Sequence, residues 1–184
     1  FDRIIPSLRD WQICASLDGT GQIGEYIRTG LNFNEWRKNY DIAVKASTHR
    51  RQVRIDFTLT LPGMFEIGNI VQLAQETNTD ILAKVIFAFT PDIVMSPLAL
   101  PRHLLDPWID ELITTCSGAM QDVLMQLKTR PTFEEQWPDT WKQGIANGKR
   151  RVLKLEQIRE DKFTMANILA GRSEILKWWN QIDC

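Results

Sequence analysis

One glycine motif in the sequence has the spacing of a nucleotide-binding loop. Residues 19–24 read G-x-G-x-x-G and follow an apolar run, 11–17, that predicts a buried strand. In dinucleotide-binding folds such glycines let backbone N–H groups and a helix N-terminus hold a pyrophosphate. Here Gly30 interrupts the expected helix, Asp18 precedes the first glycine, and no acidic residue ends a second strand about 20 residues later. We therefore favour the alternative that these glycines only relax a loop.

A polar stripe along one strand is the second candidate. Apolar and polar residues alternate over 53–61, which places Asp56, Thr58 and Thr60 on one face. In a half-buried antiparallel strand these residues would simply face solvent. In a parallel sheet covered by helices both faces should be apolar, so the stripe would instead line a lumen or cleft that holds water or a ligand. The sequence leaves both interpretations open.

The remaining reactive residue types have no spacing that predicts a site. The two histidines, His49 and His103, are 54 residues apart and show no metal-ligand spacing. Cys14, Cys116 and Cys184 are separated by 102 and 68 residues, too far for a clustered zinc or iron–sulfur site made by this chain alone. We therefore predict no metal site and assign no catalytic residue.

Composition limits the classes of partner. The 184 residues carry a net charge of −1 and a pI near 6.2, so nucleic acid is an unlikely partner, and the basic triplets 49–51 and 149–151 are expected at solvated helix ends. No window offers the ~20 apolar residues of a membrane span, so no membrane partner is expected. The odd cysteine count favours free thiols and a cytoplasmic location. Because the chain starts at Phe1 rather than methionine, we expect a piece of a longer protein.

Strands and helices alternate over the first 90 residues. The pattern predicts strands at 11–17, 53–61 and 81–89, with helices at 34–46, capped by Asn34, and from 67 to about 78. Such a βαβαβ order requires parallel pairing with right-handed crossovers. The uninterrupted apolar character of 81–89 suits a strand covered on both faces.

The second half of the chain is predicted to be helical. We expect a 1–100 α/β region with a 101–184 helical region packed on it. The helical signals are a long helix at 107–129 with a weak point at Gly118, a capping box at 132–135, a helix starting at Pro138, and a last helix capped by Ser173.

Two short segments carry a resemblance to a known family. Residues 14–19, C-A-S-L-D-G, followed by 24–28, G-E-Y-I-R, resemble the middle of radical S-adenosylmethionine enzymes, especially those with a twitch or SPASM-type auxiliary region. The resemblance continues through Trp36, the strand at 58–60 and the segment 87–101, and covers about residues 8–115.

The resemblance implies a partial (β/α)6 TIM-like barrel. In that family a 4Fe–4S cluster, held on a CxxxCxxC loop after the first strand, cleaves S-adenosylmethionine to a radical. Ser16 and Asp18 would lie at the end of the fourth strand and Arg28 just beyond, where the family contacts the cofactor's ribose and carboxylate. A hydroxyl and a carboxylate suit ribose or amine donors, and an arginine fork suits a carboxylate.

The chain departs from the family pattern in two ways. It has no CxxxCxxC segment and no first three strands, and Pro62 and Gly63 stand near the place where the family often carries an asparagine. The expected fold is therefore a three-stranded parallel βαβαβ half of the barrel followed by a helical region. Neither S-adenosylmethionine nor the cluster is expected to bind stably to this chain alone.

Three strands cannot close a barrel, so partners are expected at the open edge. The leading hypothesis is the C-terminal part of a radical S-adenosylmethionine-type enzyme, inactive without its N-terminal barrel half. The alternative is a non-catalytic α/β interaction module that forms a homodimer of half barrels. In either case Ser16, Asp18 and the turn at 60–63 should meet at one end of a parallel sheet.

Overall fold

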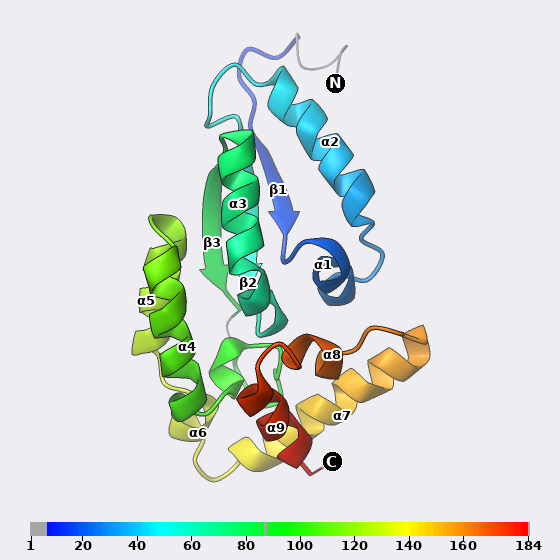
Figure 1. Ribbon diagram of the computed structural model, residues 1–184, viewed down its shortest axis with the longest axis vertical. Helices are drawn as coiled ribbons and strands as arrows, with labels where there is room; N and C mark the ends of the chain where they lie inside the picture. Colours follow the sequence, from blue (N-terminus) through cyan, green and yellow to red (C-terminus); the bar gives the residue numbers. More distant parts are fainter. Residues whose placement is uncertain (1–6, 87, 184) are drawn as a thin grey trace.

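A three-stranded parallel sheet forms the N-terminal half of the fold (Figure 1). The structure is a computed structural model that describes residues 7–86 and 88–183. The strands are β1 (Ile13–Leu17), β2 (Val53–Leu59) and β3 (Asp80–Val85), in the order β1-β2-β3, and both pairs are parallel, as predicted. The sheet is not closed, because among the described residues β1 and β3 each have a strand neighbour on one side only.

Helices make the crossovers that parallel pairing requires. They are α1 (Gly21–Ile27) and α2 (Phe33–Ala46) between β1 and β2, and the 3-10 turn η2 (Pro62–Glu66) with α3 (Ile67–Thr77) between β2 and β3. Figure 1 shows α3 in front of the sheet, with α2 and α5 (Ala119–Thr129) on either side of it.

The helices bury one face of the sheet. On that face β2 contributes side chains that are at most 1% exposed, namely Val53, Ile55, Phe57 and Leu59. The opposite face carries polar and mixed residues that are exposed or half-buried, namely Cys14, Ser16, Arg54, Asp56, Thr58, Leu82 and Lys84. The expectation that 81–89 is covered on both faces is wrong, because Leu82 is 43% exposed. Of the predicted polar stripe, Asp56 and Thr58 therefore lie on an open face of a parallel sheet, whereas Thr60 follows the strand and is 4% exposed.

A loop crosses the carboxyl end of the sheet. The third strand ends at Val85, although 81–89 was predicted, and Ile86 makes the last contact by donating its N–H to the carbonyl of Leu59 (3.1 Å). Farther along, the carbonyl of Met95 accepts the N–H of Leu61 (2.7 Å), so the loop takes over the backbone bonding that a longer β3 would have supplied. Phe87 lies outside the described residues.

The C-terminal region is helical, as predicted. Its helices are α4 (Arg102–Thr115), α5, α6 (Phe133–Gln136), α7 (Trp141–Arg159), α8 (Met165–Leu169) and α9 (Ser173–Gln181), with the 3-10 turn η3 (Pro97–Ala99) before them. Buried residues of these helices and of the sheet, such as Phe57 and Leu124, belong to one hydrophobic core. None of the described helices combines the length and apolar character needed to cross a bilayer.

Several predicted helix ends are wrong for local reasons. The predicted helix 107–129 is two helices, because Gly118 adopts φ +61° and ψ −139°, a conformation open mainly to glycine. Asn32, not Asn34, caps α2, and its Oδ1 accepts the N–H of Glu35 (3.0 Å). At the predicted capping box before α6, the Glu135 carboxylate accepts the N–H of Thr132 (2.7 Å), whereas the Thr132 hydroxyl has no partner among the described residues.

Three further boundaries differ from the sequence prediction. Helix α7 begins at Trp141, three residues after Pro138, and Arg172 rather than Ser173 precedes α9. The glycine motif at 19–24, interpreted as a loop, lies partly within the short helix α1, Gly21–Ile27. The sequence does not predict this helix, because it contains two glycines and glycine is a poor helix former.

The one-sided burial of the sheet predicts unequal effects of neighbouring substitutions on β2. Leu59→Ala should lower the free energy of unfolding by about 2–5 kcal/mol, because it opens a cavity in the core. Thr58→Ala on the open face should cost less than about 1 kcal/mol. Urea unfolding of the two variants measures the difference, and equal losses would show that the second face is also buried.

Candidate functional site

An ion pair lies at the carboxyl end of β1. Asp18 directly follows the strand and is 8% exposed, and Arg28 is the residue that ends α1. The Nη2 and Nε atoms of Arg28 donate to the same carboxylate oxygen, Oδ2 of Asp18, at 2.8 and 3.1 Å. Two of the three predicted site residues therefore come together.

The pair leaves hydrogen-bonding capacity unused. Oδ1 of Asp18 is buried and has no partner among the described residues. A buried acceptor without a donor costs about 1–3 kcal/mol, so this oxygen can accept a hydrogen bond from a water molecule or from a hydroxyl or ammonium group of a ligand. The Arg28 side chain is 43% exposed, and the pair does not use its Nη1 atom. The site thus offers one acceptor and one cationic donor side by side.

Ser16 lies apart from this pair. It is exposed on the open face of β1, in register with Asp56 of β2, and no described contact joins its hydroxyl to Asp18 or Arg28. Asp18, two residues later, lies beyond the last residue of β1 and is buried. The third predicted residue therefore does not join the Asp18–Arg28 pair.

The turn after β2 packs against the backbone of Asp18, as predicted. Gly63 donates its N–H to Oγ1 of Thr60 (3.0 Å). A Cβ on Gly63 would lie 2.9 Å from the carbonyl oxygen of Asp18, so only glycine fits there without displacing the backbone. Asp18 and the 60–63 turn thus meet at one end of the parallel sheet.

A carboxylate that the sequence pattern did not single out holds this region together. Glu66, at the end of η2, is 5% exposed. Its Oε2 accepts the N–H of Thr20 (2.8 Å) and also the Thr20 hydroxyl, and both of its oxygens lie 3.2 Å from Nδ2 of Asn69. The 46-residue separation of Glu66 and Thr20 leaves no spacing signal for this contact.

Close packing of the backbone explains the glycine motif. A Cβ on Gly24 would lie 2.0 Å from the carbonyl oxygen of Gly19, so Gly24 lets α1 pack on the loop that precedes it. The N–H of Thr20 is already bonded to Glu66, whose negative charge would repel a pyrophosphate. The geometry therefore goes against the dinucleotide interpretation and assigns these glycines to close backbone packing.

Helix α7 reaches the other end of α1. The Tyr26 hydroxyl donates to Oε1 of Glu156 (2.7 Å), and Nη1 of Arg159 donates to Oγ1 of Thr29 (2.8 Å) and to the Tyr26 carbonyl (3.3 Å). Burial raises the pKa of the Tyr26 hydroxyl well above its usual range, and its bond to the Glu156 carboxylate raises it further. These contacts span about 130 residues and were also missed from sequence.

The open face of the sheet carries charged groups of both signs. Nζ of Lys84 lies 3.8 Å from Oδ2 of Asp56, whose other oxygen is buried without a partner among the described residues. Nε of Arg54, two residues earlier on the same face of β2, is likewise buried without a partner there. This face is therefore suited to polar partners rather than to a purely apolar one.

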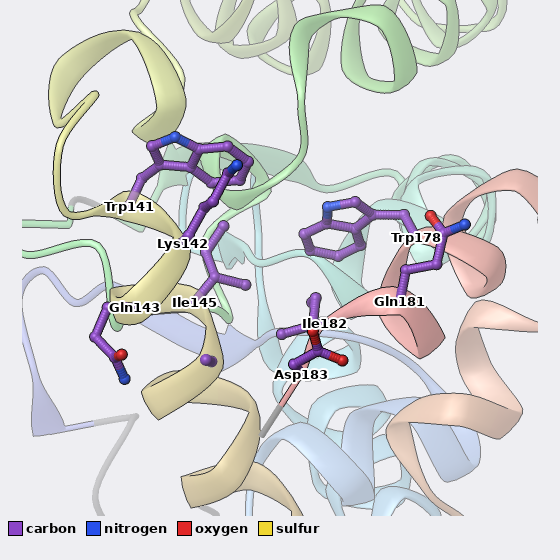
Figure 2. A pocket seen from close by; sticks show the side chains of 9 residues that line it. Trp141, Lys142, Gln143, Ile145, Trp178, Gln181, Ile182 and Asp183 are labelled. Carbon is purple, nitrogen blue, oxygen red and sulfur yellow. The ribbon is translucent and has the colours of Figure 1, made fainter.

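The described residues contain no group of three histidine, cysteine, aspartate or glutamate side chains that could hold a metal ion. Cys14 lies exposed on β1 and Cys116 follows α4, while Cys184 is outside the described residues. A separate groove of about 440 Å³ lies between α7 and α9. Figure 2 shows two of its indoles on different helices, Trp141 on α7 and Trp178 on α9, and none of Ser16, Asp18 and Arg28 lines the groove.

Comparison with known proteins adds no further assignment. No protein-family model matches the chain, and no curated protein or solved structure matches it.

Removing the Glu66 carboxylate should release the loop before α1. In Glu66→Leu the half-buried N–H and hydroxyl of Thr20 lose their acceptor, and we expect a loss of about 1–3 kcal/mol in unfolding free energy. Hydrogen exchange of the Thr20 amide should accelerate beyond the global change. Glu76→Leu on the exposed part of α3 is the control, and an unchanged Thr20 amide in Glu66→Leu would contradict this role.

Proposed function

We propose that this chain is the C-terminal part of a radical S-adenosylmethionine-type enzyme and that its sheet is the second half of a partial (β/α)6 barrel. In this proposal the open face of the sheet lines the interior of the barrel. The observation that carries the proposal is the one-sided covering of a parallel sheet, with apolar residues under the helices and charged residues on the other face.

Barrel geometry accounts for that asymmetry. In a (β/α) barrel the helices form an outer ring, so each strand has one face toward the helices and one toward the interior. A doubly wound open sheet, in contrast, has helices on both faces. The strands β1 and β3 also each keep one edge without a strand neighbour, where further strands of a barrel would continue the sheet.

The residues at the carboxyl end fit S-adenosylmethionine in their chemistry. Oδ1 of Asp18 can accept a hydrogen bond from a ribose hydroxyl or from the ammonium group, and Ser16 presents a hydroxyl on the open face of β1. The half-exposed Arg28 guanidinium suits the carboxylate of the amino acid moiety. When bound beside a reduced cluster, this cofactor supplies a radical that abstracts hydrogen.

The described residues do not fit an iron–sulfur cluster. Such clusters are held by grouped cysteine thiolates, whereas Cys14 lies on the sheet and Cys116 follows α4. In this proposal the cluster ligands belong to the N-terminal half of the barrel, and the role of this chain is to bind and orient S-adenosylmethionine at Asp18 and Arg28.

A non-catalytic interaction module is the second candidate. The observation that favours it is the mixture of charges on the open face, where Arg54 and Lys84 stand beside Asp56. A face with both signs of charge can pair with a second copy of itself, because a rotation about a two-fold axis brings unlike charges together. Two half barrels would then cover each other's open faces.

Reconstitution of the chain tests the first proposal. The isolated chain, treated with iron and sulfide without oxygen, should gain no visible cluster absorbance and should not cleave S-adenosylmethionine. A protein extended by its upstream coding sequence should gain the cluster absorbance and should cleave S-adenosylmethionine. That upstream sequence should contain an in-frame CxxxCxxC segment. Cleavage by the isolated chain, or an upstream reading frame without the motif, would contradict the proposal.

The state of association tests the second candidate. A homodimer of half barrels should bury on the order of 2,000 Å² in total, as obligate dimers do, and should sediment as one species of twice the 21.3 kDa chain mass. Reversing the charge of Asp56 with Asp56→Lys should then weaken the dimer. A single monomeric species at micromolar concentration in sedimentation equilibrium would refute it.

A further inference from the structure

We propose that Glu156 and Arg159 of α7 are positioning residues for Arg28, so that the helical region forms part of the candidate site. The importance given to Arg28 rests on the proposed function. The contacts that connect α7 to the segment carrying Arg28 are independent of the proposed function. The experiment below measures these contacts without any cofactor.

The backbone on both sides of Arg28 is held by α7. Tyr26 lies two residues before Arg28 and Thr29 one residue after it. Glu156 accepts the Tyr26 hydroxyl (2.7 Å), and Arg159 donates to the Tyr26 carbonyl (3.3 Å) and the Thr29 hydroxyl (2.8 Å). Two residues of one turn of α7 thus fix the short stretch from which the guanidinium extends.

Glu156 is itself firmly placed. The residue is 7% exposed, and the oxygen that accepts the Tyr26 hydroxyl also accepts the N–H of Met165 (2.6 Å), the first residue of α8. A buried carboxylate with two donors is costly to displace, because both donors would lose their charged acceptor. Glu156 therefore joins α1, α7 and α8 at one point.

Arg159 is also fixed in orientation. Its guanidinium carbon lies 5.2 Å from the centre of the Tyr26 ring, and its Nη2 lies 2.5 Å from Oδ2 of Asp161. The ring contact and the ion pair with Asp161 restrain the guanidinium, although its Nε is buried without a partner among the described residues. The Nη1 atom then points to the Tyr26 carbonyl and the Thr29 hydroxyl.

Helix α1 needs this external support. It has seven residues and includes Gly21 and Gly24, so it is too short and too poor in helix formers to be stable by itself. Glu66 bonds to Thr20 just before the first residue of α1, and α7 contacts its end. The two bonds from Arg28 to a single oxygen of Asp18 require the end of α1 to stay in place.

The two tyrosines of the chain provide a spectroscopic readout. Burial raises the pKa of both Tyr26 and Tyr40, but only Tyr26 also has a carboxylate as its hydrogen-bond partner. The charged groups that face Tyr26 are Glu156, Asp161 and Arg159. Removing the charge of Glu156 should therefore lower the pKa of Tyr26 and leave Tyr40 unchanged.

The test compares three variants and one control variant of the whole chain with the parent, by NMR and tyrosinate absorbance. The side-chain Nε–H of Arg28, bonded to Asp18, should exchange with water at least about tenfold faster in Glu156→Leu and in Arg159→Met than in the parent. Glu156→Gln keeps an acceptor for the Tyr26 hydroxyl and should retain slow exchange, although it lowers the pKa of Tyr26. Glu160→Gln, on the exposed end of α7, is the control for loss of a nearby charge and should change neither signal.

Two outcomes would overturn the proposal. One is slow exchange of the Arg28 Nε–H in folded Glu156→Leu and Arg159→Met, which would show that α7 does not position Arg28. The other is equally fast exchange in Glu156→Gln and Glu156→Leu, which would show that the buried hydrogen bond is not the connection. If Glu156→Leu does not fold, Tyr26→Phe replaces it, because it removes the same hydrogen bond and leaves the bond from Met165 to Glu156 intact.

Discussion

Parallel strands cannot be joined by short hairpins, so each connection in this sheet must travel back along its full length, and here helices do so. That constraint brings the carboxyl ends of β1, β2 and β3 to one edge. Asp18, the turn at 60–63 and the loop after β3 then meet there, although they are far apart in sequence. Because the crossovers cover one face only, the other face is left with polar side chains.

Buried carboxylates connect the segments that the sheet brings close. Glu66 bonds to the loop after β1, and Glu156 bonds to α1 and α8. A buried carboxylate is stable only with several donors, so each of these residues specifies one arrangement of the backbone groups around it. The Asp18–Arg28 pair lies between the two attachments of α1 and depends on both.

The open face of the sheet is the feature that both functional hypotheses share. Its unpaired polar atoms on Arg54 and Asp56 would be satisfied by the remaining strands of a barrel or by a second copy of the chain. The two hypotheses differ at the carboxyl end. A barrel enzyme needs Asp18 and Arg28 as ligand contacts, whereas an interaction module needs them only to hold α1 in place.

Local patterns alone determined the α/β class, the parallel order of the strands and the helical second half. Strict alternation at 53–59 and helical periodicity in the second half are properties of residues that are close in sequence. They also placed Asp18 at the end of β1. Only the tertiary structure showed that Arg28 pairs with Asp18 while Ser16 stands apart, and that Glu66 and Glu156 hold α1. It also showed that 81–85 is buried on one face, because burial depends on which elements come to cover a strand. Contacts across 46 or 130 residues leave no periodic trace in a single sequence, since they arise only when the chain has folded.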